Sequence, residues 1–428
     1  MKKLSKRVWS TVVLFGLVGQ IAWVIENMYF NLFLYNEISG DPTAIAWMVA
    51  ASAATATLTT IFMGALSDRV AKRKKFIAIG YLLWGLVTLS FAFISVDNVT
   101  RFFPAADAVA ATVLVVVLMD CLMTFFGSTA NDGAFNAWVT DVTDNDTRGK
   151  VETVLAVLPL MALLLIFGGF DGFVQQGDWP TFFLILGGLI ALIGLLGFFL
   201  IEEPKVVKSE QNYARTLIYG YLPKTIKTHP TLYLTLLTMG VFGIATQIYM
   251  PYFIIYIQRY LGIDAYAVLL GVVLLGASVV SMLVGRKITA KNKNRFFLPS
   301  LGVMIAGLIM LFLFRNAVLV GVAGFVMMSG NLLLSASIGA KVRDYTPIDK
   351  VGHFQGVRMI FMVLIPMIVG PFIGSFVIRS ANEFYMDLGV LKPVPTPTIF
   401  LVSALISLLV AVPLLLVFRK EKHEEKPA

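Results

Sequence analysis

The sequence predicts an all-α integral membrane protein with twelve transmembrane helices in two six-helix halves. Hydrophobic residues make up 58% of the 428 residues, charged residues only 14%, and the mean hydropathy is +0.83. Soluble domains carry about 25% charged residues, so this chain has too few charges for a surface that faces water on all sides. The composition excludes a soluble enzyme, a disordered chain and a nucleic-acid binder, and it makes the lipid bilayer the main surroundings of the protein.

Twelve apolar runs, each long enough to cross the hydrocarbon core as a helix, divide the chain. They are 8–35, 43–66, 76–96, 108–138, 151–173, 179–201, 231–257, 265–285, 296–314, 317–340, 354–378 and 397–418. None alternates polar and apolar residues as a barrel strand does. We predict an N-terminal half over 1–201, a cytoplasmic linker over 202–230, and a C-terminal half with a cytoplasmic tail over 231–428. Apolar residues set among bases predict an amphipathic interfacial helix over 212–228 of the linker.

Lysine and arginine are distributed unevenly among the segments that join these runs. The two termini, the linker and every second loop hold 28 of the 34 basic residues, whereas the opposite loops hold five. The positive-inside rule therefore places both termini and the linker in the cytoplasm. A multi-pass protein of the plasma (cell) membrane is the expected result.

A reporter fused into loop 67–75 or loop 286–295 should report a cytoplasmic location, because each loop holds five basic residues. The measurement is the activity of a reporter that works on one side of the membrane only. An external location of either loop would overturn the orientation and every statement about depth that depends on it.

The sequence offers no cluster for metal binding or covalent catalysis. Its one cysteine, Cys121, lies in an apolar run, and its three histidines, His229, His353 and His423, are far apart. We expect no disulfide, no metal, no cofactor and no enzymatic activity.

The two halves share a weak internal repeat at an offset of 203 residues. Four residues after the fourth run match four after the tenth: Asp141, Thr143, Asp146 and Gly149 match Asp344, Thr346, Asp349 and Gly352. Proline also stands inside the fifth and eleventh runs, at Pro159 and Pro366, which match after a small shift in register. Two parallel halves with matching helix breaks are typical of transporters.

The loop after the second run reads Gly64-Ala-Leu-Ser-Asp68-Arg69-Val-Ala-Lys72-Arg73-Lys-Lys75. It resembles the signature loop of the major facilitator superfamily, Gly-x-x-x-Asp-Arg/Lys-x-Gly-Arg-Arg/Lys, with Ala71 in place of one glycine. The resemblance implies the major facilitator fold, transport of a small molecule by alternating access, and gating by Gly64, Asp68 and Arg69.

A narrower likeness lies in the fourth run, Asn131-Asp132-Gly-Ala-Phe135-Asn136-Ala-Trp138, and in Gln20-Ile-Ala-Trp23 of the first. These segments are similar to the glycoside–pentoside–hexuronide cation symporters and their sucrose-transporter-like relatives. The likeness implies that Asp132 takes part in binding the sugar or the coupling cation. The sodium-coupled members carry paired aspartates in the second span, but 54–60 holds no acid here. A proton is therefore favoured as the coupling ion, with sodium as the alternative.

Three carboxylates lie well inside the runs, where a charge costs roughly 2.5–3.5 kcal/mol on insertion scales. Glu26, Asp120 and Asp132 are therefore the candidates for ion coupling. In a regular α-helix Asp132 would be rotated by about 120° from Asp120, which places the two acids on different faces. The alternatives are a salt bridge from Asp132 to Arg148 and a purely structural hydrogen bond of Glu26.

Amide and aromatic side chains accompany these acids. In the first run Gln20, Trp23, Asn27 and Asn31 share one face beside Glu26. Amides hydrogen-bond sugar hydroxyls, and flat rings stack on sugar C–H groups. The predicted substrate-binding residues are Gln20, Trp23, Asn27, Asn131, Asn136, Gln247 and Tyr252.

Other charged residues stand near the ends of the runs. Arg358 either pairs with an acid of the opposite half as a gating residue or extends to the cytoplasmic face. Asp107, Asp171 and Asp178 stand at predicted outer ends, where we expect water around them.

The resulting prediction is a monomeric secondary active transporter that couples proton symport to the uptake of a sugar or glycoside. A proton-driven exporter of drugs or metabolites with the same fold is one alternative, and a non-transporting membrane sensor is another. The amide-rich faces argue against the exporter, whose pocket would be mainly apolar.

Overall fold

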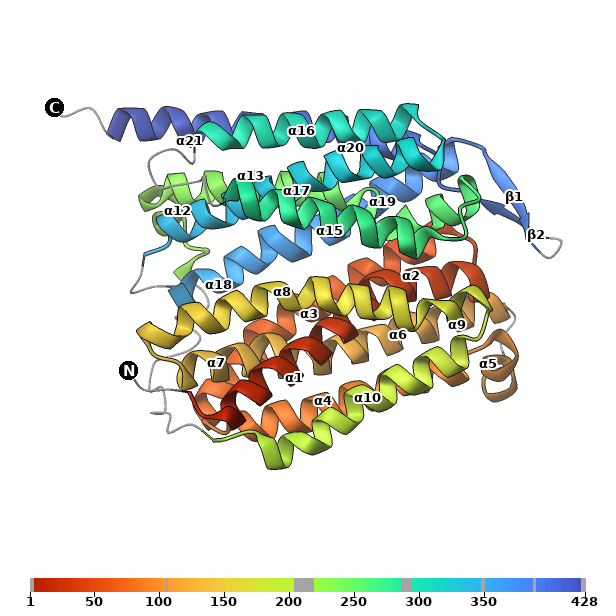
Figure 1. Cartoon of the computed structure of the whole chain (residues 1–428), viewed down its shortest axis with the longest axis horizontal. Helices are drawn as coiled ribbons and strands as arrows, with labels where there is room; N and C mark the ends of the chain where they lie inside the picture. The colour runs from red at the N-terminus through yellow and green to blue at the C-terminus, as the bar shows by residue number, and fades with distance from the viewer. Residues whose placement is uncertain are drawn as a thin grey trace. The chain divides into compact units, whose positions relative to one another are not determined.

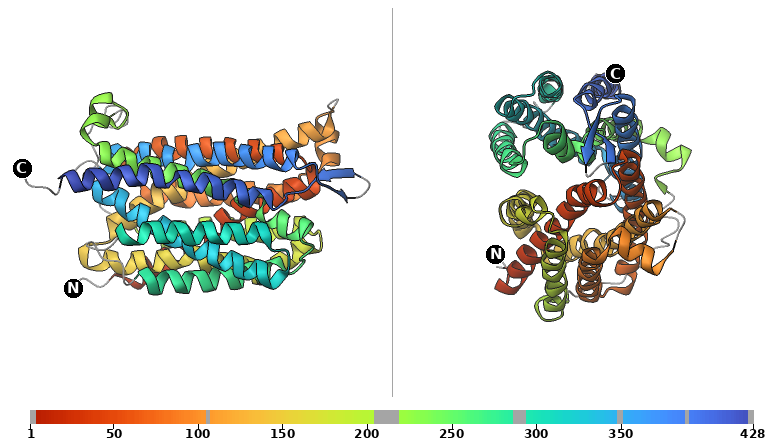
Figure 2. Two further views of the ribbon diagram at one scale, coloured as in Figure 1. Left: turned by 90° about the horizontal axis from the view of Figure 1, so that it is seen from above. Right: turned by 90° about the vertical axis from the view of Figure 1, so that its right-hand side faces the viewer.

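The computed structural model describes residues 4–104, 107–203, 219–285, 294–347, 351–387 and 390–424. The chain divides into two compact units. The first comprises Met1–Gly40 and Trp47–Asn212, and the second comprises Asp41–Ala46 and Tyr213–Ala428. Within each unit the long helices run side by side (Figure 1; Figure 2).

All regular elements in the described part of the first unit are helical. Its elements are α1 (Lys6–Val24), η1 (Ile25–Tyr29), α2 (Phe30–Phe33), η2 (Leu34–Ile38), α3 (Pro42–Val70), α4 (Arg73–Ser90), η3 (Phe91–Phe93), α5 (Val96–Phe102), α6 (Ala108–Gly127), η4 (Ser128–Phe135), α7 (Asn136–Val142), α8 (Asn145–Gly169), α9 (Asp171–Gln175) and α10 (Trp179–Leu200). Of these, η1, η2 and η4 are π-helical turns and η3 is a 3₁₀ turn. The first residues of α3 group with the second unit.

The second unit adds one short hairpin to its helices. Its described elements are α12 (Pro223–Thr228), α13 (Pro230–Gln247), η5 (Met250–Tyr252), α14 (Phe253–Ile255), η6 (Tyr256–Tyr260), α15 (Tyr266–Gly285), α16 (Asn294–Leu313), α17 (Ala317–Tyr345), α18 (Val351–Met359), η8 (Ile360–Leu364), α19 (Ile365–Ser380), β1 (Phe384–Asp387), β2 (Val390–Pro393), α20 (Thr398–Leu409) and α21 (Ala411–Glu424). β1 and β2 pair antiparallel after α19 (Figure 1).

The described residues contain 12 helical segments that are long and apolar enough to cross a membrane. They are Lys6–Ile38, Pro42–Gly64, Arg73–Phe93, Ala108–Val142, Thr147–Gly169, Trp179–Leu200, Pro230–Tyr260, Tyr266–Gly285, Asn294–Leu313, Ala317–Tyr345, Phe354–Ser380 and Thr398–Glu421. They agree with the twelve apolar runs to within a few residues. The prediction of a twelve-span, all-α membrane protein is confirmed, and the segments are called spans 1 to 12 below.

Small residues set the closest helix contacts inside each unit. A Cβ on Gly85 of α4 would lie 2.2 Å from the backbone nitrogen of Ala191 in α10. In the second unit a Cβ on Gly307 of α16 would lie 2.3 Å from the backbone nitrogen of Met327 in α17. Backbones that approach this closely gain van der Waals contact, which is the main attraction between helices in lipid.

Large apolar side chains cover the outside of the bundles. Leu114 and Leu118 of α6 are exposed, as are Val268 and Val272 of α15. Each pair is separated by four residues and so lies on one helix face. In a multi-pass membrane protein these faces contact lipid.

Asp171 departs from the sequence prediction of a solvated acid. Its side chain is only 1% exposed. The hydroxyl of Tyr29 donates to its Oδ1 at 2.8 Å, and Nε2 of Gln175 donates to its Oδ2 at 2.6 Å. The expectation was wrong because position near a span end does not decide burial. Asp171 instead fixes α9 against span 1.

The linker helix predicted over 212–228 lies in part outside the described residues, which resume at 219. The described remainder contains α12 (Pro223–Thr228). Tyr221, Leu222 and Ile226 are exposed there.

Candidate functional site

Glu26 lies in the π-helical turn η1 of span 1 and is 7% exposed. Its Oε1 accepts hydrogen bonds from Oγ1 of Thr124 at 2.8 Å and from Oγ of Ser52 at 3.2 Å. Its Oε2 is buried and has no hydrogen-bond partner among the described residues. Spans 1, 2 and 4 therefore meet at one carboxyl group.

Asp120 stands one helical turn before Thr124 on α6 and is 2% exposed. Its Oδ1 likewise has no hydrogen-bond partner in the described part of the chain. The carboxyl of Glu26 interacts electrostatically with that of Asp120. A lone buried charge is costly and two like charges repel, so at least one carboxyl of the Glu26–Asp120 pair is expected to hold a proton.

Asp132 lies in η4, the π-helical turn of span 4, and is half-buried. Oγ of Ser128 donates to its Oδ2 at 3.2 Å. A π-turn bonds residue i to i+5 rather than i+4, so each residue rotates less about the helix axis. The turn thereby reduces the 120° rotation between Asp120 and Asp132 that regular α-helical geometry predicts. The carboxyl of Asp132 also interacts electrostatically with that of Glu26. That Asp120 and Asp132 lie on different faces stays a prediction.

The alternative ion pair between Asp132 and Arg148 finds no support in the hydrogen bonds of Arg148. One of its Nη atoms donates to the carbonyl of Thr140 at 3.1 Å, and its Nε donates to Oγ1 of Thr143 at 3.3 Å. Arg148 thus closes the turn between α7 and α8.

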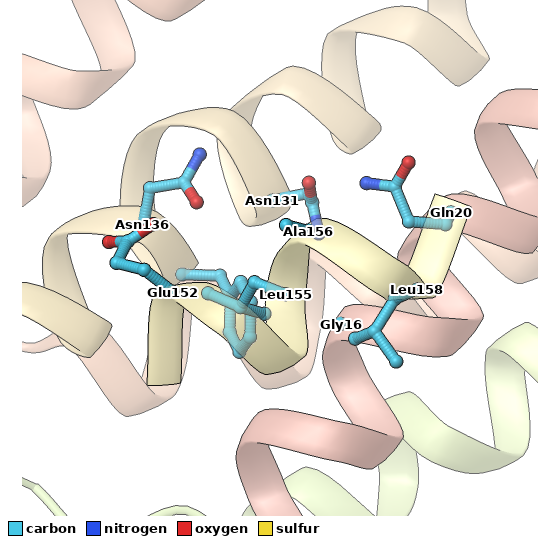
Figure 3. A pocket seen from close by; sticks show the side chains of 9 residues that line it. Gly16, Gln20, Asn131, Asn136, Glu152, Leu155, Ala156 and Leu158 are labelled. Carbon is cyan, nitrogen blue, oxygen red and sulfur yellow. The ribbon is translucent and has the colours of Figure 1, made fainter. Parts of the chain in front are cut away.

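A cavity of about 250 Å³ lies in the first unit beside η4. It is lined by Gly16, Gln20, Asn131, Phe135, Asn136, Glu152, Leu155, Ala156 and Leu158. Figure 3 shows the amides of Gln20, Asn131 and Asn136 along the cavity, with Glu152 close to Asn136. Helices α1, α7 and α8 and the turn η4 all contribute, so one six-span unit forms the cavity.

The amide of Asn131 is held in place from both sides. Nε1 of Trp23 donates to its Oδ1 at 3.4 Å, and its Nδ2 donates to the hydroxyl of Tyr81 at 2.6 Å. That hydroxyl in turn donates to the carbonyl of Phe15 at 2.7 Å. A Cβ on Gly19 would lie 2.3 Å from Nδ2 of Asn131, so the glycine makes room for this network.

The other predicted substrate residues do not line this cavity. Asn27 is exposed and donates to the carbonyl of Trp23 in its own helix at 2.8 Å. Gln247 packs against the backbone of Gly370 in the second unit. Tyr252 is fully buried, with its hydroxyl 2.8 Å from the carbonyl oxygen of Pro371. Its hydroxyl therefore serves the packing of the second unit.

Glu152 is a lining residue that the sequence argument missed. It stands near the start of α8, in a polar stretch that also fits a loop. The available signal was its spacing of three and four residues from Leu155 and Ala156, which places all three on one helix face.

The profile of the Major Facilitator Superfamily matches residues 9–338, which is more than half of the sequence. The chain belongs to the major facilitator superfamily. This superfamily membership and its transporter fold identify a membrane transporter rather than an enzyme.

Two solved structures share the fold of this superfamily member. The nucleoside transporter NupG, as its D323A mutant, aligns with a TM-score of 0.72 at 14% identity over 96% of this chain and 99% of its own. The bacterial homologue of the human lysosomal transporter Spinster, inward-facing and unoccupied, aligns with a TM-score of 0.67 at 13% identity over 100% of both chains. At these identities the likeness concerns the fold alone. No curated protein matches the sequence, and the narrower likeness to sugar–cation symporters stays a prediction.

The superfamily signature loop follows span 2 in this transporter. A Cβ on Gly133 would lie 3.4 Å from Cα of Gly64, so α3 and η4 approach closely there. Asp68 belongs to the last turn of α3, but its side chain lies outside what the structure describes. Arg69 is exposed. The gating roles of all three residues stay predictions.

Arg73 of this loop makes contacts that the sequence did not predict, since it was treated there only as a topology signal. It is buried, its Nε lies 3.0 Å from Oδ2 of Asp141, and its Nη1 lies 2.7 Å from Oγ of Ser67. It ties span 3 to the ends of spans 2 and 4. In the second unit Arg358 is half-buried, and its Nε has no hydrogen-bond partner among the described residues.

Proposed function

We propose that this transporter is a proton-coupled symporter that accumulates a sugar or glycoside by alternating access. The proposal places it in the cell membrane with both termini in the cytoplasm. One observation carries it: the buried Glu26–Asp120 pair and a cavity lined by three amides belong to the same six-span unit.

The proton is favoured because, among the described residues, no basic side chain pairs with Glu26 or Asp120. The groups that act on Glu26 are the hydroxyls of Thr124 and Ser52 and the carboxyl of Asp132. Asp120 is acted on by Glu26. A carboxyl pair of this kind can take up and release a proton without breaking a salt bridge, which is what a coupling site requires.

The sugar or glycoside is favoured by the lining of the cavity. Gln20, Asn131 and Asn136 offer paired donors and acceptors, which suit neighbouring hydroxyl groups. The volume of the cavity, about 250 Å³, lies below the roughly 300–1,000 Å³ typical of sites for drug-sized ligands. None of the lining residues is basic, so an anionic sugar is disfavoured. Nucleosides, the substrates named for the fold neighbour NupG, are N-glycosides and belong in the test.

The test is uptake by the purified protein in proteoliposomes. Labelled monosaccharides, disaccharides and nucleosides are offered with an inward proton gradient, with that gradient collapsed by a protonophore, and with a sodium gradient at symmetrical pH. We expect accumulation of at least one neutral compound under the proton gradient only. Accumulation driven by sodium alone would contradict proton coupling, and no accumulation of any of these compounds would contradict the substrate class.

Replacing Gln20 by alanine should raise the KM for the transported compound about two- to tenfold, because one net hydrogen bond contributes roughly 0.5–1.5 kcal/mol. Gln20 lines the cavity from α1. Gln176→Ala is the matched control, since Gln176 is exposed beyond α9 and lies outside the cavity. Equal KM values for Gln20→Ala and the unmodified protein would remove Gln20 from the substrate site.

A further inference from the structure

We propose that Asp132 and the Glu26–Asp120 pair are the proton-carrying groups at the two ends of one proton path, joined by hydroxyl groups of spans 2 and 4. This inference rests on the proposed function and adds a route to it. The hydroxyls come from Thr57 and Thr60 of α3, Thr124 of α6 and Ser128 of η4.

Four polar residues are evenly spaced along span 4. Asp120, Thr124, Ser128 and Asp132 follow one another at intervals of four residues. Thr124 donates to Glu26 at one end at 2.8 Å, and Ser128 donates to Asp132 at the other at 3.2 Å. The π-helical turn from Ser128 to Phe135 reduces the angle by which these four side chains rotate around the helix axis. Two acid sites are thereby connected to one row of hydroxyls.

Helix α3 contributes hydroxyls from span 2. Its Ser52 donates to Glu26, and its Gly64 lies close to Gly133 of η4. Thr57 and Thr60 stand between these two contacts along α3.

These two threonines also have unused hydrogen-bonding capacity. Oγ1 of Thr57 and Oγ1 of Thr60 are buried and have no hydrogen-bond partner among the described residues. The same holds for Oε2 of Glu26 and Oδ1 of Asp120. Buried polar groups normally have partners, so these four unpaired oxygens need an explanation. A path that takes up protons, or water that carries them, supplies those partners.

The chemistry of the path is proton transfer alone. A hydroxyl oxygen accepts a proton from one neighbour and releases its own to the next, so no charge stays on it. The proton leaves the carboxyl of Asp132, which becomes a carboxylate, and arrives on a carboxylate of the pair, which becomes neutral. Cβ atoms one helical turn apart are about 5–6 Å from each other, so one water can bridge Thr124 and Ser128.

The internal repeat indicates that the row of polar residues from Asp120 to Asp132 has a role beyond packing. At the offset of 203 residues, Asp120 and Asp132 correspond to Ala323 and Ser335. Both lie in α17, which is a continuous α-helix from Ala317 to Tyr345. Of these two corresponding spans, the one with the acids therefore has the π-turn. Packing alone would not require that difference.

Among the described residues, few titratable groups interact with the carboxyls of this path. Asp132 acts on Glu26 and on Tyr81, and Glu26 and Asp120 act on each other and on Cys121. The hydroxyl of Tyr81 is already bonded to Asn131 and to the carbonyl of Phe15. The three carboxyls are therefore the proton-carrying groups of the path.

The test is the rate at which the Glu26–Asp120 pair gains a proton after a pH jump, followed by time-resolved infrared spectroscopy of the carboxyl C=O band. The purified full chain in nanodiscs is used without substrate. Loss of the band in Glu26→Gln and in Asp120→Asn assigns it to the pair. We expect Ser128→Ala and the double variant Thr57→Val/Thr60→Val to slow its appearance about tenfold or more, as removal of a proton-transfer group does.

Two variants separate the relay from mere packing. Ser128→Thr keeps the hydroxyl and should react at the rate of the unmodified protein. Thr129→Val removes the neighbouring hydroxyl, which donates to the carbonyl of Phe125 at 2.7 Å, and should also leave the rate unchanged. Unchanged rates in Ser128→Ala and Thr57→Val/Thr60→Val, or equal slowing in Thr129→Val, would overturn the path.

The infrared experiment does not depend on the substrate. If proteoliposomes take up no sugar or glycoside, the proposed function fails, while the pH-jump rates still report whether the path exists. If proton-driven uptake is found and the rates do not respond to Ser128→Ala, only the path fails.

Discussion

Replacing Glu421 by alanine is expected to lower the free energy of unfolding by roughly 3 kcal/mol, because it leaves a buried ammonium group without its carboxylate. Lys341 of α17 is 0% exposed. Its Nζ lies 2.8 Å from Oε1 of Glu421 in α21 and 2.6 Å from Oδ1 of Asn294 in α16. One ion pair thus connects three helices of the second unit.

Aromatic rings surround the ammonium group of Lys341, so water cannot easily take the place of the Glu421 carboxylate. The ring of Phe418 lies 4.8 Å from Nζ, and those of Phe297 and Tyr345 lie 5.4 Å and 5.9 Å away. Cation–π contacts favour the charged form of the lysine but do not neutralise it. Nδ2 of Asn294 donates to Oε2 of Glu421 at 3.0 Å, and the hydroxyl of Tyr345 donates to its Oε1. Removal of the carboxylate therefore also removes the acceptor of these two hydrogen bonds.

The measurement is denaturant unfolding of the purified protein, with thermal inactivation as a second readout. Glu383→Ala is the control, since it makes the same change at an exposed position of the same unit. The double variant Lys341→Met/Glu421→Ala should recover part of the lost stability, because it removes the buried charge as well. A loss in Glu421→Ala no larger than that in Glu383→Ala would contradict the argument.

The spans could be predicted from the sequence because hydrophobic length alone decides them. A helix must satisfy its backbone hydrogen bonds within itself in lipid, and twenty apolar residues suffice to cross it. The run 265–285 and the helix Tyr266–Gly285 differ by one residue at one end for this reason. The burial of Asp171 could not be predicted in the same way, since it depends on Tyr29 of a span far away in the sequence.

The candidate site was predicted in part. Gln20, Asn131 and Asn136 line one cavity, as their shared polar character indicated. The π-turn that contains Asp132 could not be predicted, because it depends on tertiary contacts such as that of Gly133 with Gly64. Local sequence preferences do not report such contacts.

Basic residues were the other weak point. Arg73 and Lys341 were counted as topology signals of cytoplasmic loops, yet both are buried in ion pairs. Their partners, Asp141 and Glu421, lie 68 and 80 residues away in the sequence. Charge counting gives the side of the membrane, and only the fold shows which charges are paired.

Neutralising Glu26 should abolish proton-driven accumulation while substrate exchange continues. With the membrane potential held at zero, one pH unit supplies about 1.4 kcal/mol, which supports about tenfold accumulation at one proton per substrate. Glu26→Gln mimics the protonated carboxyl permanently, so we expect an accumulation ratio of about one whatever the pH gradient. The amide can still accept the hydrogen bonds of Ser52 and Thr124 through its oxygen. The local fold should therefore persist.

The measurement pairs accumulation under a proton gradient with exchange of labelled for unlabelled substrate without one, at matched protein levels. Asp171→Asn is the contrasting variant, because Asp171 is also buried but has both of its carboxylate oxygens hydrogen-bonded, to Tyr29 and Gln175. It should reduce the amount of folded protein without changing the accumulation ratio of what remains. An accumulation ratio in Glu26→Gln that still follows the pH gradient would exclude Glu26 as the proton carrier and leave Asp120 and Asp132. If both activities disappear in Glu26→Gln while the protein stays folded, Glu26 is needed for the conformational change itself, and coupling through it alone is contradicted.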